Sequence, residues 1–148
     1  VDCTVDTCLA DGTCSHVPDD GRCSGGMTCD AQQGCIGGGC ADDTFEQNDT
    51  RGEASSISTG SYPDLKICAG DEDWYRVSGL SGAFTVSIHF TNASGDLDLA
   101  VSDAQGGSLG ESQGVGDSET VQSSASGDIY IRVYGYSGAE NSYSLSVN

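Results

Sequence analysis

Seven of the eight cysteines of this chain lie within its first 40 residues. The apolar residues of that segment are scattered singly, and Gly, Asp, Ser and Thr dominate it. A short chain of this kind cannot bury enough apolar surface to offset the entropy that it loses on ordering, so it requires covalent cross-links. Dense cysteines are also typical of disulfide-bonded proteins in oxidising compartments. We therefore expect residues 1–40 to form a small, loop-dominated, disulfide-stapled module of a secreted, extracellular protein.

The spacing of these cysteines indicates a weak internal repeat. Two groups of three are spaced alike, and they are Cys3, Cys8 and Cys14 followed by Cys23, Cys29 and Cys35. Each half is expected to form a small knotted loop. If these six pair among themselves, Cys40 and Cys68 remain for each other, although eight cysteines allow many other connectivities. A zinc site is the competing interpretation, and it is disfavoured because structural zinc sites typically contain a Cys-x-x-Cys pair, which the sequence lacks.

Residues 41–148 differ from the first segment because apolar and polar residues alternate along several runs. This period of two is typical of half-buried β-strands. The clearest runs are 84–90, 97–102, 129–134 and 143–147, and the shorter candidates are 65–68, 74–77 and 119–123. Turn-forming clusters separate them at 78–82, 92–95, 106–110 and 135–138. We predict an all-β fold, an antiparallel, jelly-roll-like sandwich of about seven or eight strands, behind the disulfide-rich module.

The net charge of −18, from 23 acidic and five basic residues, restricts the partners of the chain. Binding to nucleic acid or to an anionic membrane surface requires clustered Lys and Arg, so neither partner is expected. No apolar run approaches the roughly 18 residues of a membrane span. The chain starts at Val1 without a signal peptide, and we expect it to be a piece of a longer secreted protein.

The acidic residues gather in two clusters, at 42–49 and at 71–73, just before the predicted strand 74–77. Calcium relieves the repulsion within such clusters because it binds carboxylate, amide and carbonyl oxygens. The pattern of a helix-loop-helix calcium loop is missing, so a site here would join two distant segments. On composition alone, a solvated acidic loop is the alternative interpretation.

Several segments of residues 42–148, in the same order, resemble a known family. They are 43–50, 67–75, 95–99, 130–135 and 141–145. The region is similar to the bacterial pre-peptidase C-terminal domain, an accessory β-sandwich found behind secreted peptidases and in other exported proteins. Gln47 is a departure, since the family usually has Pro there. The first 40 residues are similar, through a Cys-Thr-Val-Asp-x-Cys core, to Cys-rich repeats of large secreted bacterial proteins.

The resemblance implies a set of calcium ligands. The same fold includes the collagen-binding domains of bacterial collagenases, in which an acidic linker and a strand entry hold calcium. Carried over to this chain, the implied ligands are Glu46, Asn48, Asp49, Asp71 and Asp73. Thr44 stands where the collagen-binding version has Glu, which removes one carboxylate from the set.

Two other groups of residues are candidate binding sites. Tyr130, Arg132 and Tyr134 share one strand face, and aromatic faces bind protein or glycan. In collagen-binding relatives, tyrosines of the corresponding strand contact collagen, but we expect these tyrosines mainly to cover the sandwich. Asp96 and Asp98 flank an apolar position, so an exposed strand face is expected there, with a second cation site as the alternative.

No arrangement of catalytic residues is apparent. The two histidines, His16 and His89, lie in different regions and are expected at the surface, so a nucleophile with a base is not predicted. We expect a non-catalytic, calcium-binding accessory module of a larger secreted protein that binds an extracellular protein or polysaccharide polymer. The alternative is a structural repeat subunit of an extracellular filament or surface assembly, which would self-associate. Asn48 and Asn92 begin glycosylation sequons, which would make the chain a glycoprotein.

Overall fold

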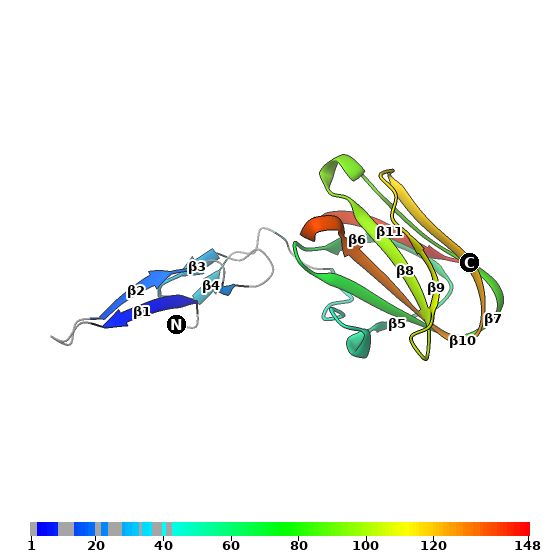
Figure 1. The fold of residues 1–148 in the computed structure, drawn as a ribbon, viewed down its shortest axis with the longest axis horizontal. Coiled ribbons are helices and arrows are strands. Elements are labelled where there is room, and N and C mark those ends of the chain that lie inside the picture. The colour runs from blue at the N-terminus through cyan, green and yellow to red at the C-terminus, as the bar shows by residue number, and fades with distance from the viewer. Residues whose placement is uncertain are drawn as a thin grey trace. The chain divides into compact units, whose positions relative to one another are not determined.

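The computed structural model describes residues 3–8, 14–19, 22–23, 28–32, 34–36, 40 and 43–148. The chain divides into two compact units, Val1–Ala41 and Asp42–Asn148 (Figure 1). Strands dominate both units, and the only helices among the described residues are single 3-10 turns. None of the helices in this part of the chain is long and apolar enough to span a membrane.

The N-terminal unit contains two β-hairpins. Strand β1 (Thr4–Cys8) pairs antiparallel with β2 (Cys14–Pro18), and β3 (Thr28–Asp30) pairs antiparallel with β4 (Gly34–Ile36). The register places Cys8 opposite Cys14 and Cys29 opposite Cys35. The two halves of the cysteine repeat are therefore equivalent hairpins, which the scattered apolar residues did not predict.

Within the described residues, two disulfides are resolved, and neither closes the β3–β4 hairpin upon itself. Cys3 bonds to Cys29 and Cys23 bonds to Cys35. The expectation of two separately knotted loops is therefore wrong, because the Cys3–Cys29 bond joins the two halves. Cys40 and Cys68 are both disulfide-bonded, and their pairing with each other stays a prediction.

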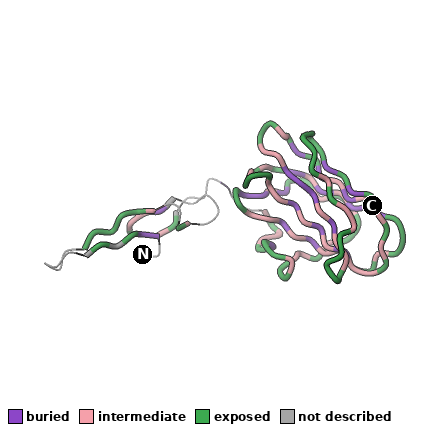
Figure 2. The backbone as a smooth tube through the Cα atoms, viewed as in Figure 1, coloured by how far each residue is buried: buried purple, intermediate pink, exposed green. Residues whose placement is uncertain are grey.

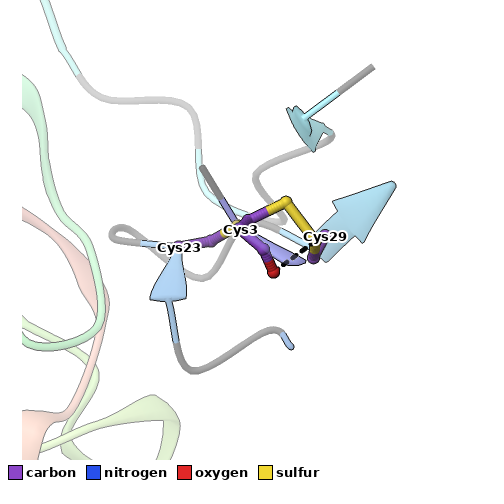
Figure 3. Close-up of side chains that lie close together, drawn as sticks. All are labelled: Cys3, Cys23 and Cys29. Atoms are coloured by element: carbon purple, nitrogen blue, oxygen red, sulfur yellow. Dashed lines mark hydrogen bonds between the residues drawn. A yellow bond between two sulfur atoms is a disulfide. The ribbon is translucent and has the colours of Figure 1, made fainter. Parts of the chain in front are cut away.

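Three sulfur atoms of this unit lie close together. The Sγ atoms of Cys3, Cys23 and Cys29 are all within 4.8 Å of one another (Figure 3). Because these atoms belong to two neighbouring disulfides, they are not thiolates that could hold zinc. The zinc interpretation is excluded for these cysteines.

The C-terminal unit contains one seven-stranded hydrogen-bonded sheet. Its strands are β5 (Ser55–Ile57), β6 (Gly60–Ile67), β7 (Glu72–Phe90), β8 (Leu97–Asp103), β9 (Ser108–Ser112), β10 (Ser118–Gly135) and β11 (Asn141–Val147). The 3-10 turns are η2 (Arg51–Glu53), η3 (Asn92–Ser94) and η4 (Tyr136–Gly138). The strand order is β6-β11-β7-β10-β8-β9, all antiparallel, and β5 adds to β7 in parallel. The predicted all-β, antiparallel fold is confirmed, apart from this one parallel pair.

The long strands β7 and β10 belong to both layers of the sandwich (Figure 1). The second half of β7 pairs with β11, whereas the second half of β10 pairs with β8. Gly82 in β7 and Gly127 in β10 have positive φ, and the β7–β10 register shifts just after Gly127. Glycine adopts such a conformation without a steric penalty, so the strands bend where other residues would end them. The predicted turn at 78–82 is therefore wrong, because it is a bend inside one continuous strand.

The core lies between the two layers, and buried positions alternate along the strands (Figure 2). Inward-facing residues such as Phe84, Ile88, Ile131 and Val133 are buried, as the alternation predicted. Each such side chain contributes about 1.5–3 kcal/mol when it is fully buried. The predicted turn at 106–110 is wrong in part, since its last residues begin the edge strand β9.

Candidate metal centre

The acidic segment at the start of the C-terminal unit is fixed to the sheet by Asp43. Its Oδ1 accepts the backbone N–H of Phe45 at 2.8 Å, and its Oδ2 accepts that of Lys66 in β6 at 2.9 Å. The Phe45 ring packs edge-on against Tyr75 of the core, with centroids 5.7 Å apart. Asp43 therefore has a structural role, which could not be distinguished from a ligand role before the fold was known.

Asn48 fastens the same segment to the start of β7. Its carbonyl accepts the N–H of Trp74 at 2.9 Å, and its Nδ2 donates to the Trp74 carbonyl at 3.3 Å. The residue is 0% exposed, yet its Oδ1 atom has no hydrogen-bond partner. An unsatisfied buried oxygen costs about 1–3 kcal/mol.

Three carboxylates converge beside Asn48. One oxygen each from Glu46, Asp49 and Asp71 lies within 4.8 Å of the other two. Asp71 belongs to the turn before β7, where its N–H donates to the carbonyl of the disulfide-bonded Cys68 at 3.1 Å. The two acidic clusters that are distant in sequence thus meet in the fold.

Asp73, the first inward-facing residue of β7, is 0% exposed and lies near this group. Its Oδ2 accepts the hydroxyl of Tyr143 at 2.5 Å, and the Tyr143 and Tyr75 hydroxyls are 2.7 Å apart. Its Oδ1 is buried without a hydrogen-bond partner. Burial, with the charges of Glu46, Asp43 and Asp71, raises the pKa of Asp73 to about 8.

Tyr75 and Tyr143 were missed as contributors to this region. Both occupy inward positions of alternating strands, and the pattern assigned them to the apolar core. A buried tyrosine hydroxyl needs a hydrogen-bond partner, and that requirement was the available signal. Here it is met by the Asp73 carboxylate, which leaves the other Asp73 oxygen unused.

The donor set of this region suits a hard divalent cation. All of the atoms are carboxylate or amide oxygens, which calcium prefers, and two of the buried oxygens lack a hydrogen bond. All five residues predicted as ligands lie in this region. Their role as ligands stays a prediction.

The predicted binding surface has a different character. The inward residues of β10 are buried, so Tyr130, Arg132 and Tyr134 lie half-buried on the outer face of the sheet. The Arg132 guanidinium lies 4.3 Å from the Tyr134 ring centroid and 5.9 Å from that of Trp74, and it forms an ion pair with Glu72. The tyrosines therefore cover the outside of one layer and do not fill the core.

Among the other predictions about single residues, those for the two histidines hold and the one for Asp98 does not. His16 and His89 are exposed, as expected. Asp98 is 4% exposed, so the exposed face predicted for it is wrong. It lies opposite Tyr134 in the register, and Gln113 donates to the Tyr134 hydroxyl at 2.5 Å.

The two sequons differ in accessibility. The Asn48 amide is buried and donates to Trp74, so in the folded protein it is not available to carry a glycan. The Asn92 amide is half-buried in η3 and donates to the Val115 carbonyl at 3.2 Å. Glycosylation at Asn92 stays a prediction.

The comparisons with known proteins concern the C-terminal unit. Residues 71–135 match the family model of the bacterial pre-peptidase C-terminal domain. The search of curated protein sequences gave no match. Among solved structures, the chain is similar to the pre-peptidase C-terminal domain of collagenase from Bacillus anthracis, with 23% identity and a TM-score of 0.52 over 64% of this chain and 94% of that one.

A more distant similarity is to PliG of Aeromonas hydrophila, a periplasmic inhibitor of g-type lysozyme. The identity is 21% and the TM-score 0.42, over 63% of this chain and 94% of that chain. The B. anthracis domain supports the fold, and the family match supports the resemblance that the sequence motifs predicted. Residues 71–135 of this chain are therefore similar to the bacterial pre-peptidase C-terminal domain family.

Proposed function

We propose that the C-terminal unit is a non-catalytic, calcium-binding module through which a secreted protein attaches to an extracellular polymer. The observation that carries the calcium part is the convergence of Glu46, Asp49 and Asp71 beside two buried oxygens without partners, Asn48 Oδ1 and Asp73 Oδ1. The disulfides fit a protein that is secreted or periplasmic.

A bound calcium ion would supply positive charge among the carboxylates that converge here. Glu46, Asp49, Asp71 and Asp73 would provide carboxylate oxygens, and Asn48 its amide oxygen. Tyr143 would orient Asp73 by donating to Oδ2, so that Oδ1 faces the ion. The result would be a cross-link between the segment before η2 and the start of β7, two parts of the chain that otherwise meet mainly through Asn48 and Phe45.

The calcium proposal is tested by thermal unfolding with calcium and with chelator. Calcium that binds only the folded state stabilises it by about 2.7 kcal/mol at one hundred times its Kd. Glu46→Gln and Asp73→Asn should each abolish most of the difference between the two conditions. Glu111→Gln is the matched control, because it removes one negative charge from the exposed face of β9. Identical unfolding of the wild-type chain in both conditions would refute the proposal.

The polymer part is supported by the outer face of β7 and β10. The register pairs Arg132 with Trp74 and Tyr130 with Arg76, so these side chains share one face. Arg51 of η2 lies over the Tyr130 ring, 4.2 Å from its centroid. Three of the five basic residues of a strongly acidic chain are thus found on this face.

Such a face suits a polymer that offers rings or prolines for stacking and oxygens for Arg. The similar B. anthracis domain comes from a collagenase, which makes collagen the first ligand to test. Polysaccharide is the second, since sugar rings also stack on aromatic side chains.

The test is co-sedimentation with fibrillar collagen and with insoluble polysaccharides. Tyr130→Ala should lower binding to the true ligand at least tenfold. Tyr136→Ala is the control, because Tyr136 is a 64% exposed tyrosine of η4 outside this strand face. As a last measurement, the chain is sedimented without polymer, to test whether it self-associates. Concentration-dependent assembly without polymer binding would refute this function and favour a structural subunit.

A further inference from the structure

Two disulfides in the described part of the N-terminal unit, Cys3–Cys29 and Cys23–Cys35, differ in exposure. Cys3 and Cys29 are 1% and 6% exposed, so their bond is covered. In the second bond, Cys35 is exposed and Cys23 is half-buried. The Cys23–Cys35 bond therefore joins the more exposed pair of residues, and it is the one that an external thiolate would meet first.

Attack at Cys35 would release a thiolate beside the covered disulfide. The incoming thiolate would bond to Cys35, and Cys23 would leave as a thiolate. The Cys23 sulfur lies within 4.8 Å of both the Cys3 and Cys29 sulfurs (Figure 3). A thiolate at that distance is placed to attack a disulfide, since exchange proceeds through direct approach of one sulfur to another.

The strand register places Cys29 where it could complete the exchange by bonding to Cys35. If Cys23 attacks the Cys3 sulfur, a Cys3–Cys23 bond forms and Cys29 leaves as a thiolate. Cys29 lies directly opposite Cys35 in the β3–β4 hairpin. Opposed residues of antiparallel strands have Cα atoms roughly 4.5–5.5 Å apart, a spacing that a disulfide can bridge.

Cys29 can then attack Cys35 and expel the external thiol. The chain would carry Cys3–Cys23 and Cys29–Cys35 bonds, with every sulfur again paired and the external thiol regenerated. No net oxidation or reduction occurs. The new Cys29–Cys35 bond would cross the β3–β4 hairpin at the position that Cys8 and Cys14 occupy across β1–β2.

We propose that the N-terminal unit is a thiol-triggered disulfide exchanger, in which Cys35 receives an external thiol and Cys23 passes the exchange to the Cys3–Cys29 bond. The exchanger has two states. The first links β3 to the N-terminus through Cys29, and the second closes the β3–β4 hairpin locally. The external thiol that starts the exchange would be a small-molecule thiol or an exposed thiol of another protein.

The pairing can be read by peptide mapping of the intact chain. After incubation with a catalytic amount of glutathione at pH 8, free thiols are blocked with N-ethylmaleimide. Cleavage after Arg22, after Met27 and before Asp30 separates Cys3, Cys23, Cys29 and Cys35 into different fragments. The two states then give disulfide-linked fragments of different mass.

The expected result is the appearance of the Cys3–Cys23 and Cys29–Cys35 fragments, at a rate that rises in proportion to thiolate concentration. Cys35→Ser should show the exchange without glutathione, because it leaves Cys23 as a thiol. A Cys3–Cys29 bond that persists alone in this variant, with Cys23 fully blocked by the reagent, would overturn the proposal.

The double variant Cys23→Ser/Cys35→Ser is the matched control. It retains the covered Cys3–Cys29 bond but has no thiol beside it, so its pairing should stay unchanged with glutathione over the same period. If glutathione opened the Cys3–Cys29 bond of the double variant at the wild-type rate, the external thiol would reach the covered bond directly. That result would also overturn the roles assigned to Cys23 and Cys35.

Discussion

Both units contain antiparallel strand pairs, and they stabilise these pairs differently. In the N-terminal unit, Val5 and Val17 face each other across β1–β2 and are 40% and 56% exposed. In the C-terminal unit, the paired Ile131 and Tyr75 are both fully buried. Hydrogen-bonded strands are therefore sustained by cross-links in one unit and by an apolar core in the other.

Reduction of the disulfides should produce the largest difference in stability between the two units. A structural disulfide typically contributes 2–4 kcal/mol, and the N-terminal unit has little buried apolar surface to replace that contribution. We expect a non-thiol reductant to remove amide-exchange protection from β1–β4 while β7 and β10 stay protected. Hydrogen exchange read by mass spectrometry measures both units in one sample, with the unreduced chain as reference. Protection of β1–β4 that survives reduction would show that the N-terminal unit does not depend on its disulfides.

Truncation of one paired apolar residue in each unit gives the next largest effect. Ile131→Ala should cost about 2–5 kcal/mol, because it leaves a cavity between the layers. Val17→Ala removes an exposed side chain and should stay within about 0.5 kcal/mol. Denaturant unfolding measures the cost of Ile131→Ala. The loss of hydrogen-exchange protection in β1–β2 measures the cost of Val17→Ala. Equal costs would show that the N-terminal unit also depends on apolar burial.

Within the C-terminal unit, the pH dependence of stability distinguishes the contribution of the buried Asp73 from that of the apolar core. Because the pKa of Asp73 is raised from 3.8 to about 8, the metal-free folded chain holds this proton more tightly than the unfolded chain. The resulting stability is present below pH 4 and is lost as the pH rises through about 8. Calcium requires the ionised carboxylate, so the calcium-dependent increase in Tm should grow across this window.

The measurement is thermal unfolding at pH 5.5 and pH 8, each with calcium and with chelator. Asp73→Asn should flatten both the pH dependence in chelator and the response to calcium. A calcium response of the wild-type chain that is larger at pH 5.5 than at pH 8 would contradict this account.

The smallest effect is expected at Asp98. Burial and the charges of Asp96 and Glu119 raise the pKa of Asp98, so its ionised form disfavours the folded state. Asp98→Asn removes the charge with little change of shape and should raise Tm slightly at pH 8, with a smaller gain at pH 4. Destabilisation at pH 8 would instead mean that the charge of Asp98 is favourable in the fold.

The sequence predicted those features that depend on local alternation. The inward residues of β10 and β11 follow from a period of two. The meeting of the two acidic clusters was predicted from the chemistry of calcium and from the family resemblance, and not from alternation. The bends of β7 and β10 were not predictable, because Gly and Ser clusters have the same composition in a turn and in a bent strand. Asp98 was misjudged because its burial depends on neighbours from other strands, such as Tyr134 opposite it in β10, and these are not visible in the local pattern. The cysteine pairing was likewise set by tertiary neighbours, and spacing could not reveal that Cys29 bonds to Cys3.

The bent strands have a consequence for how the sandwich comes apart. Because β7 and β10 run through both layers, no cut between the layers leaves the hydrogen-bond ladder intact. Peeling one layer away strips half the partners of the strands that remain. The C-terminal unit should thus melt as a single cooperative block, without a half-sandwich intermediate, and a force applied to either layer is resisted by the whole.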